Sequence, residues 1–298
     1  MNYKKFIPTL LLALLSTATA SSQNTTFTKE TFSDAGISLP YRKGNIPGDG
    51  DKAALVIYLH GGSSKGNDNE TQMNEPGINS INAWLMQHRR KAIMLVPQCP
   101  KDKSWIGSML DVLRNLLQSY VDKGVANDVY IFGGSMGGTG TWNMLANYPD
   151  LFTAAMPVAG NPTGLNAENI SMTPLYTVMG TADKIMKIQP VETMLSEMDT
   201  YEASYMFDIE QDWTHEDVCK KSYTTERLNW VFAHKSDTPD GINATEEESA
   251  NIINTEWYDM LGHPLQGRPH DKGVYLKRTT YSNGSIKCMK TIIHTGTE

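Results

Sequence analysis

The chain has 298 residues, of which 40% are hydrophobic, and a formal net charge of −7. A chain of this length and composition can bury a large core, and about 200 residues suffice for one α/β domain. The acidic balance disfavours nucleic acid and anionic membrane surfaces as partners. The sequence therefore predicts one main globular domain and a remainder that needs its own explanation.

The N-terminus has the pattern of a targeting segment. Lys4 and Lys5 precede an apolar run over residues 6–15, and Ala18-Thr19-Ala20 offers a small-residue cleavage site. The run is too short to span a membrane, so residues 1–20 are expected to be a secretory signal peptide. Its removal would leave a protein that is secreted, periplasmic or held at the cell surface.

The first strong strand signal is followed by glycines. Residues 53–59 form an apolar run that predicts a buried strand, and His60-Gly61-Gly62 follows it directly. Glycines after such a strand let backbone N–H groups face a developing negative oxygen, as in an oxyanion hole. Gly61 is the expected donor and Gly62 the alternative. In the other interpretation, His60 is a structural histidine and the glycines form an ordinary loop.

A helix is expected downstream of this loop. Apolar side chains recur at helical spacing over residues 107–123, which predicts an amphipathic helix on one face of a sheet. These residues are Val112, Leu113, Leu116, Leu117, Tyr120 and Val121. Strand and helix signals alternate from about residue 53 to about residue 234, which predicts a parallel-rich, doubly wound sheet.

The most informative segment covers residues 129–138. It joins an apolar, β-type run to a helix-like run over residues 139–148 through Gly133-Gly134-Ser135-Met136-Gly137-Gly138. A serine projects as a nucleophile when the chain turns sharply from strand to helix, and flanking glycines remove side chains that would clash there. Ser135 is therefore the candidate nucleophile, and the N–H of Met136 is the second candidate oxyanion donor. The alternative is a glycine-rich turn whose serine only caps the helix.

A serine that transfers acyl groups needs a base and an orienting carboxylate later in the chain. Residues 174–179 predict a strand, and the pattern breaks at Gly180-Thr181-Ala182-Asp183, which places Asp183 at the strand's carboxyl end. Asp183 is the candidate acid. Asp212 is its rival, and Asp183 could instead cap a helix over residues 185–198.

The candidate base is His215. A strand near residues 203–209 is followed by Gln211-Asp212-Trp213-Thr214-His215, with a helix signal after it. Active groups of open α/β sheets gather at the carboxyl ends of the strands, where Ser135, Asp183 and His215 all map. The alternative role for His215 is that of a surface residue at a helix cap.

Over residues 35–235 the chain resembles α/β-hydrolases of the esterase type. It is similar to the carbohydrate esterases that include feruloyl and acetyl-xylan esterases, and to the phospholipase/carboxylesterase and dienelactone hydrolase groups. The likeness rests on Leu59-His60-Gly61-Gly62, Val96-Pro97-Gln98-Cys99-Pro100 with Trp105, residues 133–138, residues 180–183, and His215 before Tyr223 and Trp230. Relatives often carry His-Gly where this chain has Met179-Gly180, and an aromatic residue after the histidine where it has Val218 and Cys219.

The resemblance implies an α/β-hydrolase fold for residues 21–235 and a serine esterase that needs no metal or organic cofactor. Ser135 would form an acyl-enzyme with His215 as base and Asp183 as the orienting acid, while Gly61 and Met136 hold the oxyanion. The implied substrates are esters, above all acetyl or feruloyl groups on plant polysaccharide. Two alternatives stay open: a serine peptidase of the prolyl oligopeptidase type, and an inactive carbohydrate-binding protein on the same scaffold.

Export would expose Cys99, Cys219 and Cys288 to an oxidising compartment. Cys99 follows the carboxyl end of a strand, and Cys219 follows His215 closely, so both are expected near the active site. A disulfide between Cys99 and Cys219 is one hypothesis.

The chain changes character after about His234. Residues 236–255 are polar, with Pro239-Asp240-Gly241 and Glu246-Glu247-Glu248, and are expected to be a linker. Residues 256–298 show strand signals, including a hairpin turn at Asn283-Gly284, and predict a small C-terminal β segment.

This C-terminal segment resembles the sorting domain of type IX secretion substrates, in which a Tyr-Asp-x-x-Gly stretch precedes Lys-Gly-Val-Tyr. The residues that carry the likeness are Tyr258, Asp259, Gly262, Lys272, Gly273, Val274 and Tyr275. The resemblance implies the type IX secretion machinery as a partner. An accessory β module packed on the hydrolase is the alternative.

Overall fold

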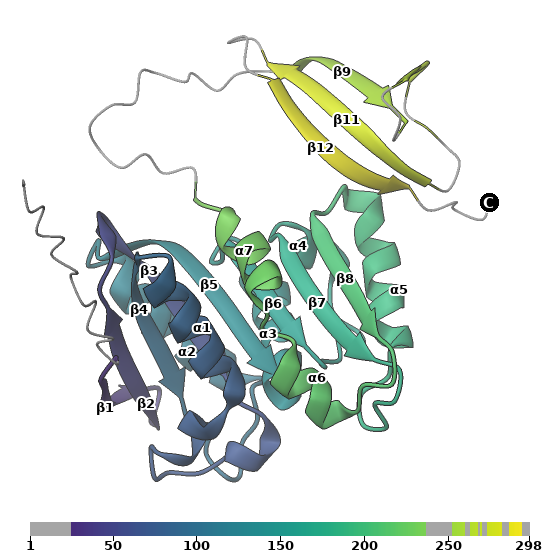
Figure 1. Cartoon of the computed structure of the whole chain (residues 1–298). Helices are drawn as coiled ribbons and strands as arrows, with labels where there is room; N and C mark the ends of the chain where they lie inside the picture. The colour runs from purple at the N-terminus through teal and green to yellow at the C-terminus, as the bar shows by residue number, and fades with distance from the viewer. Residues whose placement is uncertain are drawn as a thin grey trace, which may run out of the picture.

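The computed structural model describes residues 25–236, 252–259, 263–267, 269, 273–281 and 286–293. The predicted signal peptide, residues 1–20, lies outside them. The described part contains an eight-stranded sheet flanked by helices and a four-stranded sheet near the C-terminus (Figure 1).

The larger sheet has the strand order β1-β2-β4-β3-β5-β6-β7-β8. Its strands are β1 (Phe27–Asp34), β2 (Ile37–Ile46), β3 (Asp49–Leu59), β4 (Arg90–Pro97), β5 (Ala126–Gly134), β6 (Ala154–Val158), β7 (Leu175–Gly180) and β8 (Tyr205–Glu210). The six strands β3 to β8 pair in parallel, whereas β1 and β2 form an antiparallel edge beside β4. The predicted parallel-rich sheet is confirmed, although the sequence signals did not indicate the β1–β2 edge.

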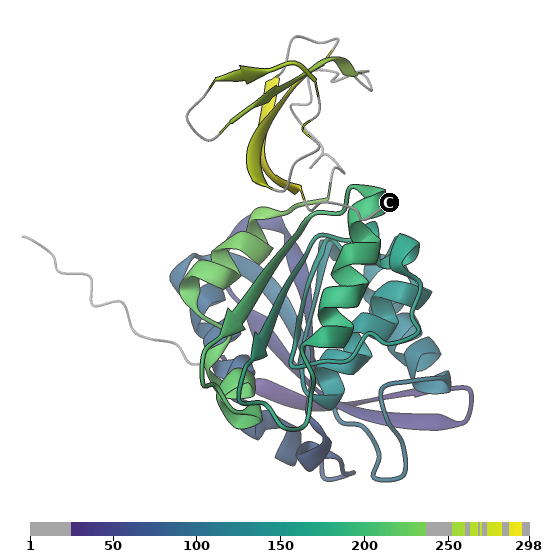
Figure 2. The ribbon, with the colours of Figure 1, turned by 90° about the vertical axis from the view of Figure 1, so that its right-hand side faces the viewer.

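Helices cover both faces of this sheet (Figure 2). They are α1 (Pro76–Gln87), α2 (Ser108–Val121), α3 (Met136–Asn147), α4 (Ala167–Ser171), α5 (Gln189–Met198), α6 (His215–Lys221) and α7 (Thr225–Ala233), with 3-10 helices η1 (Gly62–Ser64), η2 (Thr71–Asn74) and η3 (Asp199–Tyr201). Alternate side chains of β3 enter two apolar clusters. Ile57 packs on the α2, α3 and α5 side, and Val56 packs on the α1, α6 and α7 side. Burial on both faces is typical of parallel strands, whose crossover helices cover the sheet.

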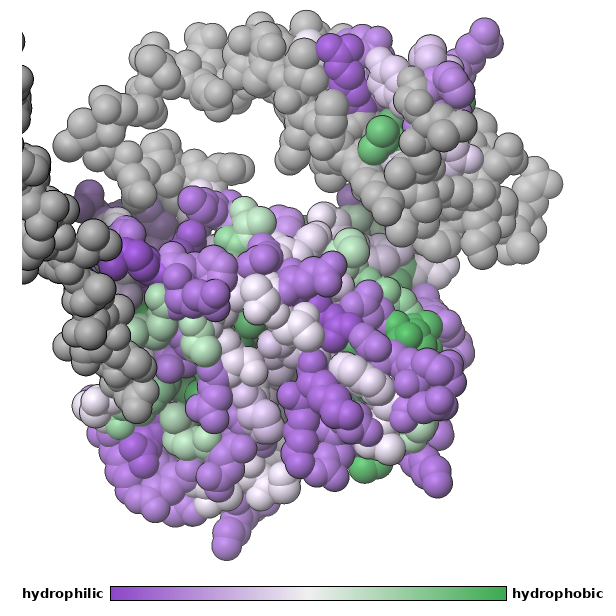
Figure 3. Space-filling model, viewed as in Figure 1, coloured by the Kyte–Doolittle hydropathy of each residue, from purple (hydrophilic) through white to green (hydrophobic). Residues whose placement is uncertain are grey.

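The surface seen in Figure 3 is mainly hydrophilic, with apolar side chains in small separate patches. No helix in the described part of the chain is long and apolar enough to cross a bilayer. Two exposed apolar residues, Ile106 and Ile185, lie in loops that follow β4 and β7. Apolar surface is therefore present at the carboxyl edge of the sheet, where the candidate site lies.

The C-terminal sheet contains β9 (Ile252–Tyr258), β10 (Pro264–Leu265), β11 (Gly273–Tyr281) and β12 (Ile286–Ile293), paired antiparallel in the order β10-β9-β11-β12. The predicted turn at Asn283-Gly284 lies outside the described residues, but β11 and β12 pair across it as a hairpin would. The predicted linker, residues 236–255, is wrong at its C-terminal end, because β9 begins at Ile252. Adjacent isoleucines favour a strand there despite the polar residues around them.

Candidate active site

The strand-to-helix turn at Ser135 has the geometry of a nucleophile elbow. β5 ends at Gly134, α3 begins at Met136, and Ser135 between them has φ 58° and ψ −118°. Such a positive φ is uncommon for a residue with a side chain and persists only where the surroundings enforce it. The N–H of Ser135 donates to Val158 O at 3.0 Å, which ties the turn to β6.

Glycines make this turn possible because main chain packs directly on main chain. A Cβ at Gly137 would lie 1.8 Å from Leu59 O, and a Cβ at Gly133 would lie 2.3 Å from Gly137 O. Neither contact leaves room for any side chain. The two glycines singled out in the sequence are therefore required by the packing of α3 against β3 and β5.

Three side chains predicted from the sequence meet at the carboxyl edge of the sheet. His215 Nε2 lies 2.8 Å from Ser135 Oγ, and His215 Nδ1 lies 2.7 Å from Asp183 Oδ2. Asp183 Oδ2 can only accept from His215 Nδ1, so the proton is assigned to this nitrogen, and Nε2 is left to accept from the serine hydroxyl. The arrangement can draw a proton from Ser135 as its oxygen attacks an electrophile.

Asp183 does not cap a helix over residues 185–198, because α5 begins at Gln189 and Ile188 is its N-cap. Asp183 instead binds backbone groups of the loop before α5 and faces the imidazole. Its Oδ1 accepts from the N–H groups of Ile185 and Met186 at 2.7 and 2.9 Å, while Oδ2 faces His215. Its side chain is fully buried. The rival, Asp212, is exposed and its Oδ1 accepts from Gln211 Nε2 at 2.9 Å. The structure thus brings Asp183, and not Asp212, to the imidazole.

The loop before His215 is fixed against the loop that carries Asp183. A Cβ at Gly180 would lie 2.3 Å from Trp213 O, and Ala182 N donates to the same carbonyl at 3.1 Å. Thr214 caps α6 through a capping box with Asp217, so His215 is the first residue of a helix whose N-terminus is stabilised by side-chain hydrogen bonds. Glycine at position 180 therefore allows the close approach of the two loops.

His60 is a buried structural residue in the loop after β3. Its Nε2 accepts from Cys99 N–H at 2.9 Å, so Nδ1 carries the proton and donates to Gly61 O at 2.6 Å. Trp105 Nε1 donates to His60 O at 3.0 Å. Burial lowers the pKa of His60 to about 4, which keeps the ring neutral at physiological pH. His60 therefore shapes the loop and makes no contact in the triad.

The three candidate oxyanion donors differ from one another in the structure. Met136 is the first residue of α3, so its N–H has no partner within the helix. The N–H of Gly61, by contrast, donates to Glu75 Oε1 at 3.1 Å. Gly62 is exposed at the start of η1, and its N–H makes no hydrogen bond within the described residues. Of the two glycines, Gly62, the alternative, is therefore the one whose N–H is available to a ligand.

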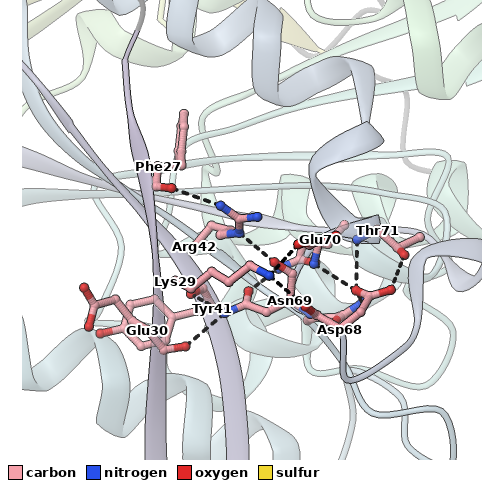
Figure 4. A network of polar contacts seen from close by, with 11 residues as sticks. Phe27, Lys29, Glu30, Tyr41, Arg42, Asp68, Asn69, Glu70 and Thr71 are labelled. Carbon is pink, nitrogen blue, oxygen red and sulfur yellow. Dashed lines mark hydrogen bonds and ion pairs between the residues drawn. The ribbon is translucent and has the colours of Figure 1, made fainter.

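The middle of the oxyanion loop, which we define as residues 60–75, is anchored to the β1–β2 edge (Figure 4). Asn69 has φ 54°, and its side-chain amide donates to the carbonyls of Glu30 and Tyr41 at 3.1 and 3.0 Å. Arg42 Nε donates to Asn69 O at 2.6 Å. The edge strands that the sequence did not indicate thus serve as a support for this loop.

Gln98 is the second anchor of the oxyanion loop. Its Oε1 accepts from Asn69 N–H at 2.7 Å, and its Nε2 donates to Asp68 Oδ1 at 2.8 Å and to Ser64 O at 3.3 Å. Gln98 is fully buried just after the end of β4. In the sequence, Gln98 is noted only as part of a segment that resembles α/β-hydrolase esterases. Its burial among polar partners depends on contacts with residues 64–69, which local sequence pattern does not indicate.

The hypothesis of a Cys99–Cys219 disulfide is wrong, since both cysteines are free thiols. Cys99 belongs to the apolar cluster on the α2 and α3 side, whereas Cys219 packs on the cluster of the opposite face. Cys219 Sγ lies 4.0 Å from His215 Nε2. Burial, with added repulsion from Glu75 and Asp183, raises the pKa of Cys219 to about 12, so this thiol stays protonated and is a poor rival nucleophile.

Among the described residues, no group of His, Cys, Asp and Glu side chains is placed to hold a metal ion.

Comparison with known proteins finds likeness in structure only. No protein-family model matches the chain, and no curated protein matches it. Among solved structures, a thermostable esterase superposes with a TM-score of 0.64 at 24% identity, over 70% of this chain and 63% of that chain. This chain therefore spans less than two thirds of the length of that esterase.

Two further structures are similar to the same part of the chain. The feruloyl esterase module from Clostridium thermocellum complexed with sinapinate has a TM-score of 0.52 at 16% identity, over 70% of this chain and 90% of that chain. The acylaminoacyl peptidase from Pyrococcus horikoshii has a TM-score of 0.54 at 13% identity, over 74% of this chain and 43% of that chain. Together with the strand order and the elbow, these likenesses show that the chain has the α/β-hydrolase fold.

Proposed function

We propose that this protein is a serine hydrolase that cleaves carboxylic esters. The observation that carries the proposal is the unbroken chain of hydrogen bonds from Asp183 through His215 to Ser135, set on a turn at positive φ. A serine hydroxyl within hydrogen-bond distance of an imidazole, with a carboxylate on the other ring nitrogen, suits nucleophilic attack on a carbonyl carbon. The same geometry counts against an inactive binding protein, in which these contacts would have no use.

In the proposed reaction, Ser135 Oγ attacks the ester carbonyl while His215 Nε2 takes its proton. His215 then gives this proton to the leaving alcohol, and the acyl group stays on Ser135. The N–H groups of Met136 and Gly62 stabilise the negative oxygen of the tetrahedral intermediate, and each such donor lowers the barrier by about 3 kcal/mol. Water, activated by His215, releases the acid.

The proposed substrates are acetyl or feruloyl esters on plant polysaccharide. This choice is supported by the sequence likeness to carbohydrate esterases and by the feruloyl esterase module among the similar structures. A serine peptidase is the second candidate, because an acylaminoacyl peptidase is also among them. The fold and the triad order are common to both classes, so the leaving group has to be found by assay.

Ester hydrolysis by the full chain tests the proposal. Wild type should hydrolyse p-nitrophenyl acetate, Ser135→Ala should have lost this activity, and Ser80→Ala, which alters a serine in α1, should match wild type. Methyl ferulate should be cleaved, and proline-containing anilides should not. Activity on the anilides alone would favour the peptidase. Equal rates for wild type and Ser135→Ala would remove Ser135 as the nucleophile.

The two ends of the chain are proposed to direct export. Residues 1–20 would be removed as a signal peptide, and the C-terminal segment from residue 256 would engage the type IX secretion machinery. Mass spectrometry of the mature extracellular protein tests both steps. A chain that begins at Met1 would contradict the first, and a chain that is intact through Glu298 would contradict removal of a sorting tail.

A further inference from the structure

Glu75, the last residue of the oxyanion loop, directs its carboxylate at the start of this loop. It is the residue before α1, yet its side chain makes no capping hydrogen bond to that helix. Instead its Oε1 accepts from the N–H of Gly61 at 3.1 Å and from the hydroxyl of Ser64 at 2.7 Å. One carboxylate oxygen therefore links the two ends of a short turn, and the first of these ends borders the nucleophile.

This contact lies close to the reacting centre. A Cβ placed at Gly61 would be 3.6 Å from Glu75 Oε1 and 3.7 Å from Ser135 Cβ. The carboxylate and the serine thus both lie close to Gly61, near the position that a side chain there would occupy. Ser64 is held from its other side as well, because its carbonyl accepts from Gln98 Nε2 at 3.3 Å.

The direction of the N–H groups in this turn follows from the backbone. Gly61 is extended, with φ −71° and ψ 173°, so the N–H of Gly61 and the N–H of Gly62 point in different directions. Glu75 takes the first of them. The second is left to face away from the carboxylate, at the exposed start of η1.

We propose that Glu75 is a positioning residue for the oxyanion hole, in that its carboxylate holds Gly61 N–H and Ser64 Oγ so that Gly62 N–H is presented to the oxyanion. This inference rests on the proposed esterase function. What the loop needs from Glu75 is an oxygen that accepts two hydrogen bonds, and not a negative charge. A charge beside a developing oxyanion is repulsive, so a neutral acceptor of the same shape serves the reaction at least as well.

Three variants of the full chain test this role. Glu75→Gln keeps an oxygen acceptor and removes the charge, Glu75→Leu removes the acceptor, and Ser64→Ala removes one of the two donors. We expect kcat for p-nitrophenyl acetate to fall by about 10- to 100-fold in Glu75→Leu, because a displaced oxyanion donor weakens transition-state binding. Ser64→Ala should show a smaller loss, and Glu75→Gln should stay within about threefold of wild type, with KM changed little throughout.

A tetrahedral inhibitor separates this role from a general structural one. Phenylboronic acid forms a tetrahedral adduct on an active serine, so its inhibition constant should rise across the variants by the same factor by which kcat/KM falls. The amide proton of Gly61 should exchange faster with solvent in Glu75→Leu than in wild type, since its acceptor is gone. If Glu75→Leu does not fold, the comparison of Ser64→Ala with Glu75→Gln decides the matter.

Several results would overturn the inference. The first is a wild-type kcat in Glu75→Leu or, if that variant is unfolded, in Ser64→Ala. The second is a loss of kcat in Glu75→Gln as large as in Glu75→Leu. The third is a reduced kcat/KM with an unchanged inhibition constant for phenylboronic acid. Failure of the proposed function itself looks different, because wild type would then show no ester hydrolysis that depends on Ser135.

Discussion

The elbow and the oxyanion loop lie at the same edge of the sheet but are held in place by different means. At the elbow, Gly133 and Gly137 let backbone pack on backbone, with no side chain between. In the oxyanion loop, the side chains of His60, Gln98 and Glu75 bind backbone groups that would otherwise lack partners. The elbow depends on the absence of a Cβ, whereas the loop depends on polar side chains, two from its own ends and one, Gln98, from the residue after β4.

This difference sets what each region tolerates. A clash between backbone and a new Cβ has no easy relief, so the elbow should fail entirely when a glycine is replaced. Side-chain hydrogen bonds can be lost one at a time, so the loop should weaken by steps. Substitutions in the two regions can therefore be compared directly.

The largest effect is expected from Gly137→Ala. Its Cβ would lie 1.8 Å from Leu59 O, so we expect loss of at least about 4 kcal/mol of unfolding free energy or failure to fold. Gly62→Ala is the matched control, because a Cβ there meets nothing within 4 Å. Urea unfolding measures both. Similar unfolding midpoints for the two variants would contradict the steric account of the elbow.

The loop after β7, which carries Asp183, depends both on a glycine packed against backbone and on a side-chain hydrogen bond. Asp183→Asn tests the side-chain hydrogen bond. The change keeps the volume but places a donor or a neutral oxygen against His215 Nδ1, so the imidazole loses its preferred tautomer. We expect kcat for p-nitrophenyl acetate to fall by about 10⁴-fold. Asp212→Asn should leave kcat unchanged, since Asp212 does not contact the histidine. A larger loss in Asp212→Asn would reverse the assignment of the acid.

A smaller effect is expected from Gln98→Leu in the oxyanion loop. The substitution removes hydrogen bonds to Ser64, Asp68 and Asn69, so we expect a loss of about 2 kcal/mol in stability and about tenfold in kcat. Gln118→Leu, which removes one exposed bond to Asp122 at the end of α2, is the control. Calorimetry and steady-state kinetics give both values. No difference between the variants would mean that the loop holds its shape without Gln98.

The last effect is that of pH, which acts on the loop through His60 and is expected in stability alone. Burial lowers its pKa from 6.5 to about 4 in the folded protein, so the unfolded chain binds more protons in that window. Stability should therefore rise with pH between these values, and His60 should account for a loss of about 2 kcal/mol as the pH falls from about 7 to about 5. Urea titrations of wild type and His60→Asn measure this. An equal pH slope in both would contradict a neutral, buried His60.

The same contrast explains what the sequence could predict. Ser135, Asp183 and His215 each follow a strand within a few residues, so local pattern and chain order were enough to find them. Gly133 and Gly137 lie two residues on either side of this serine, so they belong to the same local pattern. The engagement of Gly61 by Glu75 spans 14 residues and depends on how α1 starts, which no local pattern reveals.

Two other features lay beyond sequence reasoning for physical reasons. The turn between β1 and β2 places Ala35 at φ 48°, where glycine or asparagine would be the usual signal. The expected disulfide rested on Cys99 following a strand end and on Cys219 lying close to His215 in the sequence. Neither observation indicates on which face of the sheet a cysteine lies. Cys99 and Cys219 lie on opposite faces, and that depends on side-chain direction in the folded chain.

Labelling with a fluorophosphonate probe tests the central claim most directly, because the probe reacts only with a serine activated by its neighbours. The account predicts that native protein is labelled on the peptide that carries Ser135, as located by mass spectrometry, and that His215→Ala is not labelled. Folded wild-type protein that fails to react, or that carries the label on another residue, would contradict the assignment of Ser135 as the nucleophile.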